Sequence, residues 1–289
     1  MSDDGAGAIT QPLAVEVTLS SDDIAAIKAL PRARDNGFWK NYSLLISVCA
    51  FLLSLATAII SAYVSHQRDI HDQLSELNNA IRTIQELNLK HIEVTTKYSG
   101  IQGNPAEELI RNQIYIATIS AADVAVRVGS YATTASVIPI SQNLYGYGQY
   151  QKAKQLAEIG LTAARSAEDE SAALVWLGAM KFKLQTPEAI KEGNQYFEQA
   201  RHLDVKYAIS DSDLAAFIEA GVELNWAESL AFFDCNLAQK HYSEGWKILS
   251  SAGPTADLIT LRQAASAKLN TGIGGVISCK PLPVATSTN

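Results

Sequence analysis

Residues 42–64 read YSLLISVCAFLLSLATAIISAYV, a run of 23 residues without a charged side chain. A helix needs ~20 apolar residues to cross the hydrocarbon core of a bilayer. Phe38, Trp39 and Tyr42 mark one end of the run and Tyr63 the other, at the depths where aromatic rings favour the membrane interface. We therefore predict a single transmembrane helix over residues 42–64.

Two other interpretations of this run fit the sequence less well. A buried helix of a globular core is rarely apolar on every face over such a length. A cleaved signal peptide has a short basic leader, whereas 41 residues precede this run and six of them are acidic. Residues 1–41 are expected to lack fixed structure for the most part, with one short helical candidate from Ser21 to Leu30.

The basic residues that flank the run predict its direction. Lys28, Arg32, Arg34 and Lys40 precede it, and only Arg68 lies within a similar distance after it. Because Lys and Arg are retained on the cytoplasmic side, we expect a cytoplasmic N-terminus and a C-terminal region in the periplasm or the extracellular space. The opposite topology stays open.

Composition indicates a folded protein and excludes one broad class of partner. The 289 residues are 47% apolar and 18% charged, with a net charge of −7. The 23 Lys and Arg residues are scattered, so the basic surface of a nucleic-acid-binding protein is missing. Cys49, Cys235 and Cys279 lack the spacing of a metal cluster, but Cys235 and Cys279 could pair if their region is exported.

A heptad pattern follows the apolar run and predicts an amphipathic helix or coiled-coil stalk over residues 65–98. Its apolar positions recur in steps of four and three at Ile70, Leu74, Leu77, Ile81 and Ile84. One interpretation is a parallel stalk that holds a homodimer or homotrimer together through these five side chains. The other is a single helix that folds back on its own chain, because only about two heptads are sustained.

Residues 105–270 read as an all-α domain. Gly100, Gly103 and Pro105 separate it from the heptads, and amphipathic windows then recur between Gly and Pro punctuation without a strand pattern. The expected helices cover residues 105–128, 130–146, 149–166, 169–185, 187–203, 212–239 with a break, 241–251 and 255–270. Residues 271–289 are expected to form a flexible tail.

Small residues recur beside bulky ones at helical spacing within this domain. The sets are Gly148, Tyr150, Ala153 and Ala157; Leu174, Leu177, Gly178, Gly193, Phe197, Ala200 and Asp204; and Tyr242, Gly245 and Leu249. Over residues 130–252 the pattern resembles the tetratricopeptide repeat, a helix-turn-helix unit of ~34 residues. The resemblance implies stacked helix pairs with a concave face for a peptide or protein partner. It assigns no binding residue, because the motif positions are packing positions.

The sequence offers no constellation that indicates chemistry. The histidines are His66, His71, His91, His202 and His241. The spacing of five between His66 and His71 does not place them on one helical face, and His202 and His241 have no acidic or Cys partner at ligand spacing. The run from Thr271 to Gly275 lacks the strand, helix and Lys of a phosphate loop. We therefore name no catalytic, cofactor-binding or metal-ligating residue, and we expect a protein that is not an enzyme.

Two functions fit this organisation. The first is a non-catalytic scaffold or adaptor, anchored in the lipid bilayer, that binds a protein partner through its helical domain. The second is a membrane sensor or effector subunit, whose helical domain binds a small ligand and signals through the stalk.

Overall fold

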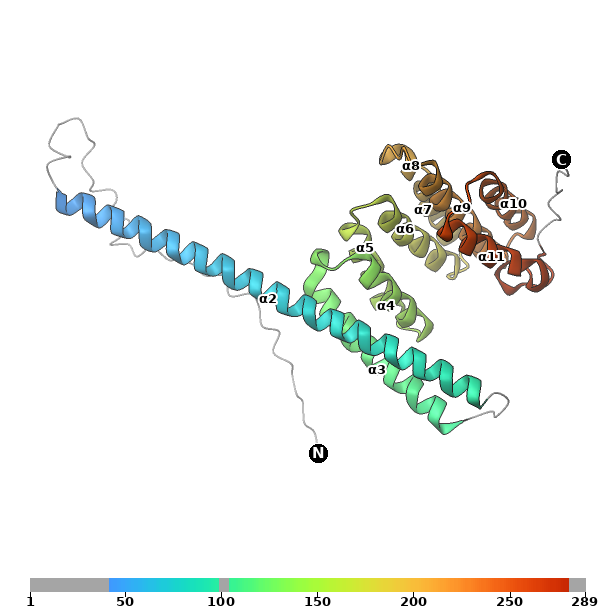
Figure 1. Cartoon of the computed structure of the whole chain (residues 1–289), viewed down its shortest axis with the longest axis horizontal. Helices are drawn as coiled ribbons and strands as arrows, with labels where there is room; N and C mark the ends of the chain where they lie inside the picture. The colour runs from blue at the N-terminus through green and yellow to red at the C-terminus, as the bar shows by residue number, and fades with distance from the viewer. Residues whose placement is uncertain (1–41, 99–103, 281–289) are drawn as a thin grey trace. The chain divides into compact units, whose positions relative to one another are not determined.

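The computed structural model describes residues 42–98 and 104–280, and it divides the chain into residues 1–64 and residues 65–289. All secondary structure in the described ranges is helical, which confirms the all-α prediction there. The predicted segment 1–41 and the end of the predicted tail, 281–289, lie outside the described residues. Figure 1 shows the order of the helices.

The first helix, α2 (Tyr42–Lys97), contains the apolar run. From Ile46 to Val64 its side chains are exposed, and no segment of the described ranges covers them. It is the one helix in the described ranges that is long and apolar enough to cross a membrane.

The later part of α2, from Ser65, packs against α3 (Pro105–Val128). Leu77 and Ile84 are buried and belong to one apolar cluster with Ile114 of α3. The carboxylate of Glu76 lies 3.2 Å from the Arg127 guanidinium, and His91 lies 3.6 Å from Glu107, as antiparallel helices require. The heptad face is therefore used within the chain, which is the fold-back alternative, and the oligomeric stalk stays a prediction.

The remaining helices follow one another with short connections. They are η2 (Gly129–Tyr131), α4 (Thr134–Gly146), α5 (Tyr150–Ala163), α6 (Ala167–Phe182), α7 (Pro187–Arg201), α8 (Leu203–Lys206), α9 (Ser212–Leu230), α10 (Cys235–Ser251), α11 (Ala256–Thr271) and η3 (Ile273–Gly275). Side-chain oxygens of Thr133, Ser166, Thr186, Asp211 and Asp234 accept backbone N–H bonds at helix starts. The expected 212–239 helix ends at Leu230, and its last residues begin α10 after the cap at Asp234.

Glycines allow close contact within three consecutive helix pairs. A Cβ on Gly178 of α6 would lie 2.9 Å from the Phe197 ring of α7, and a Cβ on Gly193 would lie 2.8 Å from Phe182. Gly160 meets Val137 and Ile138 across the α4–α5 pair, and Gly245 meets Leu224 across the α9–α10 pair. The repeat units that the sequence pattern predicts, and the family resemblance, stay predictions.

Helix α6 lies between two apolar clusters. Leu177 and Met180 belong to the cluster formed with α2 to α5, whereas Leu174 and Phe182 belong to the cluster formed with α7 to α11. A helix that is apolar on two faces joins the two halves of the domain into one packed structure.

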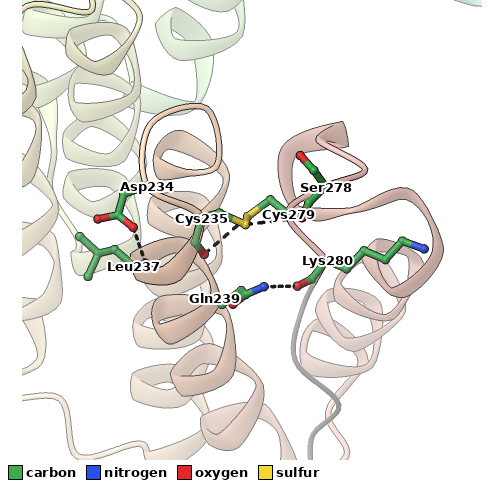
Figure 2. The surroundings of a disulfide bond; sticks show 7 residues. All are labelled: Asp234, Cys235, Leu237, Gln239, Ser278, Cys279 and Lys280. Atoms are coloured by element: carbon green, nitrogen blue, oxygen red, sulfur yellow. Dashed lines mark hydrogen bonds between the residues drawn. A yellow bond between two sulfur atoms is a disulfide. The ribbon is translucent and has the colours of Figure 1, made fainter.

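The start of the expected flexible tail is packed in the structure. Ile273 and Cys279 are fully buried, and Cys279 forms a disulfide with Cys235 of α10 with a Cα–Cα distance of 5.3 Å (Figure 2). Gly272 and Gly274 have φ of 84° and 59°, which glycine adopts without strain. The difference from the sequence-based expectation arises because the glycines form tight turns that bury Ile273.

Candidate binding groove

A groove runs across the first helix of each of the three pairs, α4, α6 and α9. It has a volume of about 940 Å³. Its lining also takes in the turns after α6 and α9, the first residue of α5 and part of η3. The lining includes Gln142, Tyr145, Tyr150, Trp176, Lys183, Gln185, Asn225, Glu228, Ser229, Phe232, Phe233 and Gly274. We call this feature the aromatic groove.

Three aromatic rings form a connected row in the aromatic groove. The ring centroid of Tyr145 lies 4.8 Å from that of Tyr150 and 5.6 Å from that of Trp176. Their planes are inclined by 60° and 81°, so edges meet faces and the rings form slots rather than a flat stack. Lys183 places its ammonium 6.0 Å from the Tyr145 centroid.

The aromatic side chains of the groove retain much exposed surface. Phe232 is 63% exposed and Tyr150 is 54% exposed, and Phe233 beside them is also exposed. Exposed apolar residues scattered singly need no explanation, but several gathered in one concave feature indicate an interaction site. The aromatic groove is thus suited to an apolar or aromatic surface of another molecule.

A buried hydrogen-bond chain fixes the position of Trp176. Its indole Nε1 donates to Ser141 Oγ at 2.7 Å, and that hydroxyl donates to the Ala153 carbonyl at 2.6 Å. These bonds link α6, α4 and α5, because the three groups come from three consecutive helices. The indole is therefore held in one orientation before any partner arrives.

Polar groups in the aromatic groove are mostly neutral. Asn225 Nδ2 donates to the Gly221 carbonyl at 2.7 Å, which leaves its Oδ1 as an acceptor. Burial, assisted by Tyr150, raises the pKa of Tyr145, so its hydroxyl stays protonated at neutral pH. Among the described residues of the lining, Lys183 and Glu228 supply the charges. This composition suits binding rather than acid–base chemistry.

A buried charge cluster lies at a second cavity, of about 630 Å³, lined by α7, α9 and α10. The Glu223 side chain is 1% exposed. Its Oε1 accepts from Arg201 Nε at 2.7 Å, and also from Arg201 Nη2, while its Oε2 lies 2.7 Å from His241 Nδ1. Burial acts to raise the pKa of Glu223, but hydrogen bonds from His241 and Arg201 outweigh it and hold the pKa below its usual value.

Aromatic stacking surrounds this charge cluster. Trp226 lies between the His241 ring, at 4.1 Å between centroids, and the Phe197 ring, at 5.3 Å. The Arg201 guanidinium lies 5.0 Å from the Trp226 centroid, and Trp226 Nε1 donates to Asn194 Oδ1. Because both carboxylate oxygens and the imidazole Nδ1 are engaged, the geometry is that of a paired, buried charge that ties three helices together.

The structure brings one of the five histidines into a buried network. His241 joins Glu223, whereas His202 is largely exposed beside Glu198, and His91 lies beside Glu107. Sequence reasoning missed Glu223 and Arg201, because Glu223 lies 18 residues from His241 and 22 residues from Arg201. One signal was available: Glu223 stands between Val222 and Leu224 in a helix that is apolar on most faces. Within the described ranges no three His, Cys, Asp or Glu side chains form a candidate metal site.

Comparisons of the chain with protein-family models, with curated proteins and with solved structures find no match.

Proposed function

We propose that this protein is a membrane-anchored, non-catalytic scaffold that binds a segment of a protein partner in the aromatic groove. The observation that carries the proposal is the row formed by Tyr150, Tyr145 and Trp176, preset by hydrogen bonding and still open to solvent. Aromatic rings supply large contact area at a small cost in side-chain entropy, which makes them effective anchors.

The lining of the groove favours an extended, uncharged segment of the partner. Slots between inclined rings accept apolar or proline side chains, and neutral amides such as Gln142 and Asn225 can bond to a partner backbone. Lys183 and Glu228 carry charges of opposite sign, so the lining has no field of one sign that would attract a strongly charged segment. The three helix pairs support the proposal, since repeat stacks present such concave surfaces.

The anchor of the scaffold is the exposed apolar part of α2, from Ile46 to Val64. We further propose that the domain faces the periplasm or the extracellular space. Two independent observations support this orientation: basic residues precede the apolar stretch, and the domain contains the Cys235–Cys279 disulfide. The partner would then belong to the same oxidising compartment.

Site-specific photo-crosslinking in living cells tests this function. A benzophenone side chain replaces Phe232 in the groove or, as the control, Tyr131, which is similarly exposed at 55% but lies outside the groove lining. We expect a discrete protein adduct from position 232 that Tyr150→Ala weakens by about tenfold or more, and none from position 131. Absence of an adduct at 232, or equal adducts at both positions, would overturn the proposal.

A small-ligand sensor is the second candidate, and the cavity at the charge cluster favours it. Its volume of about 630 Å³ lies within the usual range for small-molecule sites, and Arg201, His241 and Asn194 converge on it. Thermal unfolding of the full chain in detergent micelles, with a panel of metabolites, distinguishes the two functions. A metabolite that raises the melting temperature in wild type but not in Asn194→Ala favours the sensor.

A further inference from the structure

The segment 272–280, which we call the C-terminal clip, forms one end of the aromatic groove. Gly274 lines the groove, and a Cβ there would lie 3.0 Å from the Glu228 carbonyl and 3.5 Å from the Phe232 ring. Ile273, next to it, is fully buried in the cluster with α9, α10 and α11. The clip therefore packs against the end of α9 and against the turn after it that carries Phe232.

Few interactions hold the C-terminal clip apart from the buried Ile273, the partly buried Val276 and the disulfide. Within the clip, Ile273 N donates to the Cys279 carbonyl at 2.8 Å, and Cys279 N donates to the Val276 carbonyl at 2.9 Å. One hydrogen bond fastens it to α10, from Gln239 Nε2 to the Lys280 carbonyl at 2.7 Å (Figure 2). The three glycines of the clip lose more backbone freedom on ordering than other residues, so the clip depends on its covalent tie.

The covalent tie is attached to the same turn that carries the groove aromatics. Phe232 and Phe233 lie between α9 and α10, and Cys235 follows two residues after Phe233. The disulfide thus links the clip directly to the turn that presents two groove rings. Breaking the disulfide therefore removes a restraint that lies two residues from Phe233 in the groove lining.

We propose that the Cys235–Cys279 disulfide is a redox latch of the aromatic groove. In the oxidised chain the clip supports Phe232 and Phe233, and the groove is competent to bind. Reduction releases the clip and weakens binding. This proposal rests on the function proposed for the groove.

The reducing step requires a dithiol, and the structure indicates which sulfur it attacks. Cys279 is fully buried, whereas Cys235 is partly exposed. A dithiol thiolate attacks Cys235 Sγ, forms a mixed disulfide and expels Cys279 as a thiolate, which takes up a proton. The second thiol of the reductant then displaces Cys235, so the reductant becomes a cyclic disulfide and the protein gains two thiols.

Hydrogen exchange of the full chain in detergent micelles tests the latch without any partner, with dithiothreitol as the reductant. We expect amide exchange in residues 272–280 and 228–235 to accelerate at least tenfold on reduction, while α4 and α5 keep their protection. A clip that stays protected, or a clip that opens without change in residues 228–235, would overturn the latch. Cys49→Ser is the control. Cys49 is a free thiol outside the disulfide, so its replacement should not change the effect of dithiothreitol on exchange.

A second variant separates the clip from the sulfur chemistry. Ile273→Asp expels the clip while the disulfide remains, and we expect the same acceleration in residues 228–235 without reductant. The photo-crosslink at position 232 then distinguishes the two proposals. If exchange is coupled but no adduct forms in either redox state, the groove function fails, and only the structural coupling of the disulfide to residues 228–235 stands. If the adduct is unchanged by reduction, the latch fails and the groove function stands.

Discussion

At the scale of single residues, Glu223 is a buried carboxylate that is held by hydrogen bonds at both oxygens. Its carboxylate is buried between Arg201 and His241, which come from the two neighbouring helices. Removing one member of a buried ionic cluster leaves the others desolvated and without a partner.

We expect Glu223→Ala to lower the free energy of unfolding by about 3 kcal/mol, at the low end for a buried pair because Arg201 retains some solvent contact. Chemical unfolding of the full chain in detergent measures this change. Glu158→Gln, on an exposed carboxylate of α5, is the control and should change stability by less than about 0.5 kcal/mol. Equal effects from the two variants would contradict a structural role for the cluster.

The pH dependence of stability follows from the same carboxylate. Because the pKa of Glu223 is lower in the folded chain than its usual value of 4.5, its contribution is fully present above that value. The contribution is lost as the pH falls below 4.5 through the folded-state pKa. Melting temperatures measured between pH 7 and pH 3 should fall less steeply for Glu223→Gln than for wild type. An unchanged acid slope would show that this group does not govern acid unfolding.

The close contacts of glycine give a second prediction at this scale. Gly193→Ala should lower stability by about 1–3 kcal/mol, because its Cβ would overlap the Phe182 ring at 2.8 Å. Gly221→Ala is the matched control: it lies inside α9 with nothing within 4 Å, so higher helix propensity should stabilise the chain by up to about 1 kcal/mol. Thermal unfolding of the two variants gives shifts of opposite sign if the helix pairs pack as described.

At the scale of elements, the α2–α3 pair shows what a periodic pattern can and cannot specify. Steps of four and three place Leu77 and Ile84 on one face of α2, and the structure buries both. The same period fits a neighbour from another chain or from the same chain, because the face alone does not identify what covers it. Whether the face of α2 packs within the chain depends on α3, and the residues of α3 that contact α2 are distant from it in the sequence.

Truncation of the heptad face tests this pairing. Leu77→Ala should destabilise the α2–α3 pair by about 2–5 kcal/mol, since Leu77 is 1% exposed, whereas Leu89→Ala, at 67% exposed on the same helix, should have little effect. Hydrogen exchange of α3 in each variant gives the readout. Protection of α3 that survives Leu77→Ala would favour an intermolecular use of the heptads.

Sequence reasoning predicted the helices better than the contacts between distant helices. Capping residues and apolar periodicity are local signals, so the bounds of α3 were reproduced residue for residue and most others within a few residues. The charge cluster and the C-terminal clip depend on segments 18 to 44 residues apart, which local patterns do not encode. Gly272, Gly274 and Gly275 are compatible with a flexible linker and with a set of tight turns. The burial of Ile273 between them shows that they form tight turns.

At the scale of the whole molecule, the apolar part of α2 and the disulfide make one joint prediction. If the domain is outside the cytoplasm, an impermeant maleimide added to intact cells should label Cys235 and Cys279 only after reduction. Cys49→Ser removes the third thiol from the readout. Labelling that requires lysis would reverse the proposed orientation, and labelling without reduction would show that the disulfide is absent in cells.

The position of α6 between two apolar clusters sets a rule for anyone who divides this protein into smaller pieces. A fragment that ends before Ala167 would leave Ile140 and Leu144 of the first cluster without the residues that α6 contributes, and a fragment that begins after Phe182 would do the same to the second cluster. Neither half is a module that could be exchanged or inherited separately. Shortened versions intended for expression should therefore keep residues 65–280 intact.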